Sequence, residues 1–195
     1  MSTTVLDRTA PTDAPVLDIL AERWSPRAYD ESSAIDEGKL ASALEAARWS
    51  PSAYNNQPWR FIVARRGSAA HAAIADTMID FNKTWATKAG VLVVAVAELE
   101  SDEGRVHPTA HYDLGQAVAH LSVQAHHDGL FVHQMTGFDA PAVHAHFDLP
   151  DRLEVLSLLA VGDLGDAAQL PEGARERETA PRERRPIAET VLVND

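Results

Sequence analysis

The chain of 195 residues contains no cysteine, so disulfides, thiolate nucleophiles and cysteine-held metal or iron–sulfur centres are excluded. It also lacks any apolar run near the ~20 residues that a membrane-spanning helix needs, because its longest run, 91–97, has the length of a strand. Its N-terminal segment shows no basic stretch followed by an apolar one, as a secretory signal would require. We therefore expect a cytoplasmic protein that is not attached to a membrane.

Positive charge is scarce in this sequence. There are 17 Lys and Arg residues against 29 Asp and Glu, which gives a formal net charge of -12. Such a surface disfavours binding to nucleic acids and anionic lipids. Two glycine-rich phosphate motifs, Gly-x-Gly-x-x-Gly and the Walker loop, are missing, which argues against a doubly wound dinucleotide fold. The length, with 45% hydrophobic and 24% charged residues, suits one globular domain.

Hydrophobic periodicity predicts helices and strands that are interspersed without a regular βαβ order, so the expected fold class is α+β. The helical segments are 16–23, 35–49, 69–85, 109–128 and 141–147. The strand segments are 60–64, 91–97, 130–134 and 153–161. Segment 91–97 is apolar throughout, so we expect it to be covered on both faces. Ser33 is the expected N-cap of the second helix.

The two ends of the chain differ in composition. Residues 1–15 are rich in Thr, Pro and Asp and are expected to form a flexible tail. Residues 16–195 are expected to form a single domain. Its last part, 186–193, is apolar and is expected to be an extended C-terminal arm that packs against another surface, with a partner subunit as one candidate.

Neutral hydrogen-bonding side chains are concentrated between Pro51 and Trp59, in the run Pro-Ser-Ala-Tyr-Asn-Asn-Gln-Pro-Trp. The prolines make this run a poor helix interior, and its polarity makes it a poor central strand. A rigid loop that presents the amides of Asn55 and Gln57 suits a flat, uncharged ligand ringed with donors and acceptors. The alternative is that these amides bond only to the backbone of their own loop, as Asn commonly does.

Two arginine-rich runs suit an anion. The run 23–27, Arg-Trp-Ser-Pro-Arg, offers two guanidinium groups and a hydroxyl, which fit a phosphate. The alternative is that Arg23 and Arg27 form ordinary salt bridges, with Glu22 and Asp30 as partners. Five of the fourteen arginines lie between 175 and 185, where interleaved glutamates also allow a solvated run of charges.

Four runs, in this order along the chain, resemble the motifs of the FMN-dependent nitroreductase family. Run 23–27 is similar to the family's Arg-x-Ser-x-Arg/Lys phosphate site, and 51–59 to its Pro-Ser-x-x-Asn-x-Gln-Pro-Trp loop. Run 129–139 is similar to the Gly-Leu…Gly-Phe-Asp segment that lies over the flavin ring. Run 182–186 resembles the C-terminal basic pair before a proline, and the matched region extends from about residue 17 to 193.

The resemblance implies a three-layer fold, with a central and mainly antiparallel sheet flanked by helices, and an intertwined homodimer. It implies FMN as the cofactor, NADH or NADPH as the hydride donor, and a nitroaromatic, quinone or similar small aromatic acceptor, with ping-pong kinetics. The implied cofactor-binding residues are Arg23, Trp24, Ser25, Arg27, Pro51, Ser52, Ala53, Asn55, Gln57, Asn82, Gln134, Thr136, Gly137, Arg182 and Arg184.

Some of these assignments have alternatives. Arg185 can take the place of Arg184, and Gly137 can be a simple turn glycine. In the family the loop after Pro51 reaches into the partner subunit's site. The candidates for walls of the acceptor pocket are Tyr54, Trp85 and Phe131. No side chain stands out as a general acid or base, so no catalytic residue is assigned.

Nine histidines invite a metal interpretation. There is no His-Glu-x-x-His run, and Pro108 separates His107 from His111, so we expect no metal site. His120 and His127 are expected at a packed interface. Besides the enzyme, two hypotheses stay open: a non-catalytic flavin-binding or flavin-storage protein on the same scaffold, and a histidine-rich metal-binding module.

Overall fold

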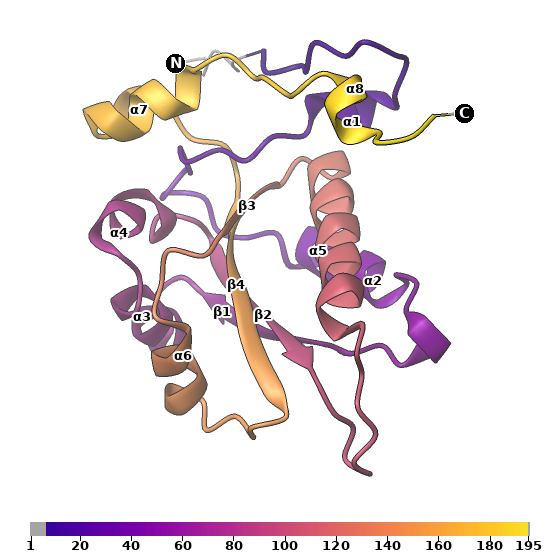
Figure 1. Ribbon diagram of the computed structural model, residues 1–195. Coiled ribbons are helices and arrows are strands. Elements are labelled where there is room, and N and C mark those ends of the chain that lie inside the picture. Colours follow the sequence, from indigo (N-terminus) through magenta and orange to yellow (C-terminus); the bar gives the residue numbers. More distant parts are fainter. Residues whose placement is uncertain (1–6, 195) are drawn as a thin grey trace.

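A four-stranded antiparallel sheet lies at the centre of the molecule, whose computed structural model describes residues 7–194 (Figure 1). The strand order is β1-β2-β4-β3, and each neighbouring pair is antiparallel. The bounds are β1 (Trp59–Arg65), β2 (Val91–Glu98), β3 (Phe131–Met135) and β4 (Leu153–Gly162). The expected α+β class with a mainly antiparallel sheet between two helical layers is confirmed.

Strand β2 shows how the sequence builds the three layers. All eight of its residues are buried, as predicted for a strand covered on both faces. Because successive side chains of a strand point to opposite faces, Val91 and Val93 enter one hydrophobic cluster while Leu92 and Val94 enter the other. The sheet therefore separates two apolar cores, one beneath each helical layer.

One helical layer consists of α2 (Glu37–Arg48) and α5 (Ala110–His127). Helix α5 buries Leu114, Ala117 and Leu121, which recur at the helical period. Helix α2 begins at Asp36, whose carboxylate accepts hydrogen bonds from the backbone N–H groups of Gly38 and Lys39. The predicted N-cap Ser33 was therefore wrong by three positions; its hydroxyl donates to Asp163 instead.

The other layer contains α3 (Ala69–Asp76), α4 (Asp80–Ala86) and α6 (Ala140–His146). A single helix over 69–85 was predicted, and the structure divides it. The break lies where the N–H of Ile79 donates to the carbonyl of Gly137 at 3.1 Å and Met78 forms a β-bridge with Phe138. A contact with a distant segment thus replaces the local helical hydrogen bond of Ile79.

Three short helices lie above the sheet in Figure 1: α1 (Asp18–Glu22), α7 (Glu172–Thr179) and α8 (Ile187–Thr190). Helix α7 was not predicted, because its surface is almost wholly polar and only Ala174 and Glu178 are buried. Segment 186–193 is not extended throughout, since it contains the turn of α8, and Leu192 is 92% exposed.

The N-terminal tail expected over 1–15 lies partly outside the described residues, which begin at Asp7. Residues 7–15 carry no helix or strand, and the N–H of Ala10 donates to the carbonyl of Ala21 at 2.9 Å. Across residues 7–194, no helix combines the length and apolar character needed to cross a bilayer.

Candidate functional site

Five arginine residues line one cavity of about 180 Å³ beside α1 and α7. They are contributed by the N-terminal segment, the end of α1, helix α7 and the segment that follows it, and Trp24 and Ser25 complete the lining. The five are Arg8, Arg23, Arg177, Arg182 and Arg184. The structure thus brings together Trp24, Ser25 and three of the four arginines expected at a phosphate. We call this cavity, with its seven lining residues, the arginine cavity.

Like charges are held close together in the arginine cavity. Burial lowers the pKa of Arg23, and the positive charge of Arg184 lowers it further. Burial also lowers the pKa of Arg182, with smaller contributions from Arg23, Arg184 and Arg8. Within the described part of the chain, none of the five guanidinium groups forms a salt bridge with a carboxylate. An anion bound here would remove this mutual repulsion.

Arg182 ties three segments together. Its Nη1 donates to the carbonyl of Ala21 at 2.6 Å and also to that of Arg8, and its Nη2 donates to the carbonyl of Arg23 at 2.9 Å. These bonds satisfy carbonyl groups at the end of the short helix α1, which lack partners inside the helix. The segment after α7 is thereby joined to both N-terminal segments.

Arg27 does not line the arginine cavity. Its guanidinium carbon lies 5.8 Å from the centroid of the Trp85 ring, and its Nη1 is 4.0 Å from a carboxylate oxygen of Glu178. Glu178 is 1% exposed and accepts hydrogen bonds from the backbone N–H groups of Arg27 and Ala28, at 2.8–3.0 Å. The salt bridges proposed for Arg27 with Asp30 and for Arg23 with Glu22 do not form in the described chain.

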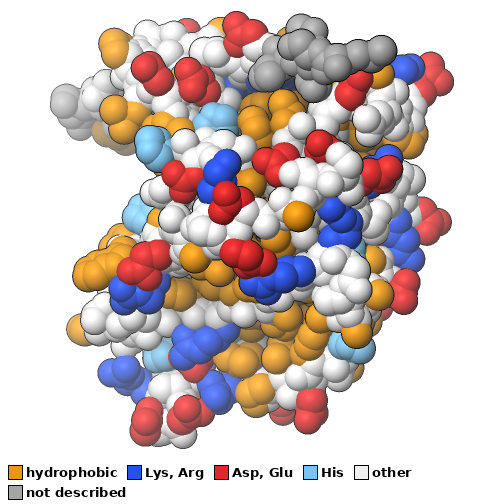
Figure 2. Space-filling view, turned by 180° about the vertical axis from the view of Figure 1, so that it is seen from behind, with side chains coloured by type: hydrophobic (Ala, Val, Ile, Leu, Met, Phe, Trp, Pro, Cys, Tyr) orange, Lys and Arg blue, Asp and Glu red, His pale blue; other side chains and the backbone are white. Residues whose placement is uncertain are grey.

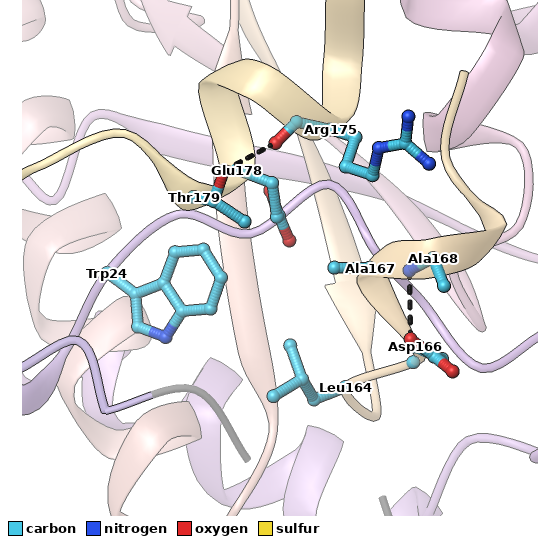
Figure 3. Close-up of a pocket in the computed structure, with 9 residues that line it drawn as sticks. Trp24, Leu164, Asp166, Ala167, Ala168, Arg175, Glu178 and Thr179 are labelled. Atoms are coloured by element: carbon cyan, nitrogen blue, oxygen red, sulfur yellow. Dashed lines mark hydrogen bonds between the residues drawn. The ribbon is translucent and has the colours of Figure 1, made fainter. Parts of the chain in front are cut away.

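Glu178 projects from α7 into a second cavity of about 220 Å³. Figure 3 shows its carboxylate between Trp24 and Ala167, while the side chain of Arg175 points away from it. Burial raises the pKa of Glu178, although the N–H groups of Ala28 and Arg27 oppose this effect. The buried carboxylate fixes α7 against the segment that contains Arg23 and Ser25.

The amide loop, residues 51–57, follows α2 and has a strained backbone. Three of its residues have left-handed φ values: Tyr54 at 51°, Asn55 at 55° and Gln57 at 50°. The Ser52 hydroxyl accepts a hydrogen bond from the N–H of Gln57 at 3.0 Å. The Gln57 amide donates to the carbonyl of Asn55 at 3.2 Å, so it does bond to its own loop, as the alternative interpretation proposed.

Asp113 of α5 anchors the amide loop. Its carboxylate accepts hydrogen bonds from the backbone N–H of Ala53 at 3.2 Å and from the hydroxyl of Thr109 at 3.0 Å. Within the loop Pro51 and Asn55 are exposed, and the Tyr54 side chain is 95% exposed. The loop is therefore held from one side and presents its other side to solvent.

Asn82 and Gly137 lie together at the break between α3 and α4. The Asn82 amide donates to the carbonyl of Gly137 at 3.1 Å. A Cβ atom at position 137 would lie 2.5 Å from Asn82 Nδ2 and 2.8 Å from Ile79 Cδ1, so any other residue would displace these side chains. Thr136 is exposed beside them. Gln134 lies apart, because its amide donates to the hydroxyl of Ser122 on α5 at 2.6 Å.

The amide loop and the arginine cavity lie at opposite ends of α5. The loop bonds to Asp113 near one end, and His126 near the other end shares a cavity with Glu22 and Trp24. At 1.5 Å per residue, this span of α5 corresponds to about 20 Å. In Figure 1 the second end of α5 points toward α1 and α8. One chain therefore does not bring the two halves of the expected site together.

Of the three candidates for walls of the acceptor pocket, Phe131 and Tyr54 each line a cavity and Trp85 does not line an open one. Trp85 is 1% exposed and stacks against Tyr29, so the expected role as a wall of an open pocket was wrong. Phe131 packs edge-on against Trp24, with 6.4 Å between the ring centroids. Tyr54 does line a cavity, of about 420 Å³, together with Val106 and Pro108.

Arg8 and Arg177 line the arginine cavity but were not identified from the sequence. Arg177 lies inside the arginine-rich run 175–185, which gave a compositional signal without singling it out. Arg8 lies in the expected tail and had no local signal. Among the histidines, Nδ1 of His120 lies 2.9 Å from the hydroxyl of Ser50, and no three metal-ligating side chains cluster within residues 7–194.

Comparison with known proteins identifies the class first. The chain is similar to a solved structure described as the oxidoreductase containing FMN, at 33% identity over 96% of each chain with a TM-score of 0.89. It is similar to a putative nitroreductase from Desulfovibrio desulfuricans solved in complex with FMN, at 25% identity over 94% of this chain and 99% of that one, with a TM-score of 0.75. The fold is thus that of FMN-containing oxidoreductases.

The sequence comparisons specify the family. The profile of the Nitroreductase family matches residues 20–96. An uncharacterized 15.4 kDa protein from the ask 5' region of Mycolicibacterium smegmatis is 37% identical over 144 residues, which cover 69% of this chain and 95% of that protein. The chain belongs to the nitroreductase family.

Proposed function

We propose that this protein is an FMN-dependent oxidoreductase that uses NADH or NADPH to reduce a nitroaromatic, a quinone or a similar small aromatic acceptor. The observation that carries the proposal is the arginine cavity, which is lined by five arginine residues that form no salt bridge with a carboxylate among the described residues. Bound FMN would supply the redox chemistry, accepting hydride from the nicotinamide and passing it to the acceptor. A doubly charged phosphate fits the arginine cavity because charge-assisted hydrogen bonds favour it.

The arginine cavity is the proposed phosphate end of the cofactor site. Arg23, Arg182 and Arg184 supply the positive charge there, and Ser25 supplies a neutral donor. Trp24 forms an apolar wall. Arg27 contributes through its backbone N–H, which binds Glu178 and so holds the segment 23–27 in place.

The proposed ring end uses neutral groups. Carboxamides donate and accept hydrogen bonds from one side chain, which suits the carbonyl and N–H groups at the edge of a flat heteroaromatic ring. The residues proposed to face the ring or its sugar-like chain are Pro51, Ser52, Ala53, Asn55, Gln57, Asn82, Gln134, Thr136 and Gly137. Gly137 allows a close approach to the backbone, because it has no Cβ atom.

A homodimer would bring the two ends together. About 20 Å separates the amide loop from the arginine cavity within one chain, so we propose that the loop of one subunit completes the site of the other. Exposed apolar side chains next to the loop support an interface: Trp49 is 72% exposed and Tyr112 is 71% exposed. Figure 2 shows further hydrophobic side chains at the surface, between interspersed acidic and basic ones.

Binding and orientation are the proposed contributions of the protein, and no side chain is proposed as an acid or base. A nicotinamide and an acceptor that use the same open face of the ring must bind in turn, which gives ping-pong kinetics. The reaction is proposed to take place in the cytoplasm, where NADH and NADPH are available. In a symmetric dimer each subunit would complete the site of the other, which would give two sites per dimer.

Steady-state kinetics test the proposed function. NADH or NADPH oxidation is measured at several fixed concentrations of a nitroaromatic or quinone, and parallel double-reciprocal lines are expected. A protein that binds FMN but oxidises neither nucleotide in the presence of an acceptor would instead be a flavin-binding or flavin-storage protein. Metal analysis of the same sample tests the histidine-rich metal-binding hypothesis.

A further inference from the structure

We infer that Arg8 and Arg177, which lie outside every family-like motif of the chain, bind the phosphate group in the arginine cavity, whereas the motif residue Arg182 positions the segments around it. This inference rests on the proposed function, because the phosphate is that of FMN. The guanidinium donors of Arg182 are already bonded to backbone carbonyls of the protein, whereas Arg8 and Arg177 form no such bonds among the described residues.

Arg8 is held at the arginine cavity with donors to spare. Its guanidinium carbon lies 5.2 Å from the centroid of the Trp24 ring, a cation–π distance that fixes the side chain in place. Its Nε is buried and has no hydrogen-bond partner in the chain from residue 7 to 194. A buried donor without an acceptor is costly, and a shift of the Arg8 side chain toward a bound phosphate would give this donor an acceptor.

Arg177 reaches the same cavity from α7. Its guanidinium carbon lies 4.7 Å from the centroid of the Phe81 ring, and it donates to no carboxylate among the described residues. The neighbouring Glu178 is anchored to the backbone of Arg27 and Ala28. This anchor sets the rotation of α7, so that Arg177 lines the arginine cavity while Arg175 lines the other one.

Arg182 has fewer hydrogen-bond donors available for an anion, because its two terminal nitrogens already donate to backbone carbonyls of Arg8, Ala21 and Arg23. One of these carbonyls belongs to Arg8 itself, so Arg182 holds the segment that carries Arg8. Loss of Arg182 is therefore expected to loosen the walls of the cavity. Loss of Arg8 or Arg177 removes a charge, its donors and one cation–π contact, and leaves the backbone hydrogen bonds made by Arg182 in place.

The experiment compares FMN with riboflavin, which has the same ring and no phosphate. Dissociation constants are measured by quenching of flavin fluorescence on the full chain stripped of flavin, for the wild type and for R8A, R177A, R182A and R175A. R8A and R177A are each expected to weaken FMN at least tenfold, which corresponds to about 1.4 kcal/mol, and riboflavin less than about twofold. R175A, from the same helix but outside the arginine cavity, is the matched control and should change neither constant.

R182A is expected to weaken both flavins and to lower the midpoint of thermal unfolding, as a positioning residue should. The conservative variants R8K and R177K retain the charge and are expected to recover part of the FMN affinity. They also keep the test decisive if an alanine variant does not fold.

Three results would overturn the inference. They are unchanged FMN affinity in R8A and R177A, an equal loss of FMN and riboflavin affinity in both variants, or a loss confined to FMN in R182A at an unchanged unfolding midpoint. If the wild type itself takes up no FMN, the proposed function fails. If the wild type binds FMN and R8A and R177A bind it equally well, only the proposed role of Arg8 and Arg177 is contradicted.

Discussion

The arginine cavity and the amide loop are built in opposite ways. The arginine cavity is assembled from segments far apart in sequence, with Arg8 and Arg182 separated by 174 positions and joined by a hydrogen bond. The amide loop is one continuous run whose conformation depends on local left-handed residues and on hydrogen bonds to Asp113 of α5 and from Arg60 of β1. The residues of the arginine cavity thus come from one chain, whereas the amide loop presents Pro51, Tyr54 and Asn55 to solvent, where we propose that a second subunit binds.

Removal of two charges from the arginine cavity should have the largest effect. Arg23 and Arg184 line it and form no salt bridge within the described chain, so the double variant R23A/R184A leaves the protein's own ion pairs intact. Each lost charge-assisted hydrogen bond costs about 1.5–3 kcal/mol, so FMN affinity should fall by about a hundredfold or more. Calorimetric titration measures this fall, and an equal fall for riboflavin would contradict a phosphate site.

Loss of the Glu178 carboxylate should destabilise the arginine cavity more than the amide loop. In E178A the buried N–H groups of Arg27 and Ala28 lose their acceptor, and the free energy of unfolding should fall by about 4 kcal/mol. E178Q retains one acceptor oxygen and should lose about half as much. E176A changes an exposed glutamate of the same helix and serves as the control in chemical denaturation.

Acid should weaken the region of the arginine cavity through His133. Burial lowers the pKa of His133 to about 4, and its Nδ1 lies 2.9 Å from the carbonyl of Pro26. Between pH about 4 and 6.5 the folded protein binds fewer protons at this site than the unfolded chain, so stability rises with pH across this window. The contribution, about 3 kcal/mol, is complete above pH 6.5 and is lost as the pH falls to 4.

Unfolding of wild type and H133N at a series of pH values measures this contribution. The variant should show a flatter pH dependence between about 4 and 6.5. His71 and His126, whose pKa values are also lowered by burial, add to the slope that remains, and Glu178, whose pKa burial raises, opposes it. Parallel curves for the two proteins would rule out a role for His133.

A smaller effect is expected at the ring end. In G137A the new Cβ would lie 2.5 Å from Asn82 Nδ2, so the Asn82 amide and Ile79 must move, at a cost of about 2 kcal/mol. FMN and riboflavin affinities should fall together, because this position is proposed to face the ring that both share. A loss of affinity for FMN alone would contradict a position of Gly137 beside the ring.

Most of the fold could be predicted because its signals are local. Residues 91–97 of β2 are all apolar, and α5 buries Leu114, Ala117 and Leu121 at a regular period. The break between α3 and α4 could not be predicted, since the hydrogen bond from Ile79 to Gly137 that replaces the helical one spans 58 positions. Helix α7 carries too few apolar residues to give a periodic signal.

Residues of the candidate site could be predicted where they lie in a family-like motif. The motif order pointed to Arg23, Ser25, Arg182 and Arg184, which the structure gathers in the arginine cavity. It also pointed to Arg27, whose guanidinium turns to Glu178 and Trp85 instead, because a buried carboxylate on a distant helix attracts it. Arg8 enters the arginine cavity through a long-range backbone contact, which no pattern within the first residues encodes.

The visible spectrum of the purified full-length protein, before and after anaerobic addition of NADH or NADPH, tests the central claim most directly. A flavin spectrum that bleaches with the nucleotide and returns when a quinone or nitroaromatic is added is the predicted result. A colourless protein that takes up no FMN, or a flavin spectrum that excess nucleotide leaves unchanged, would contradict it.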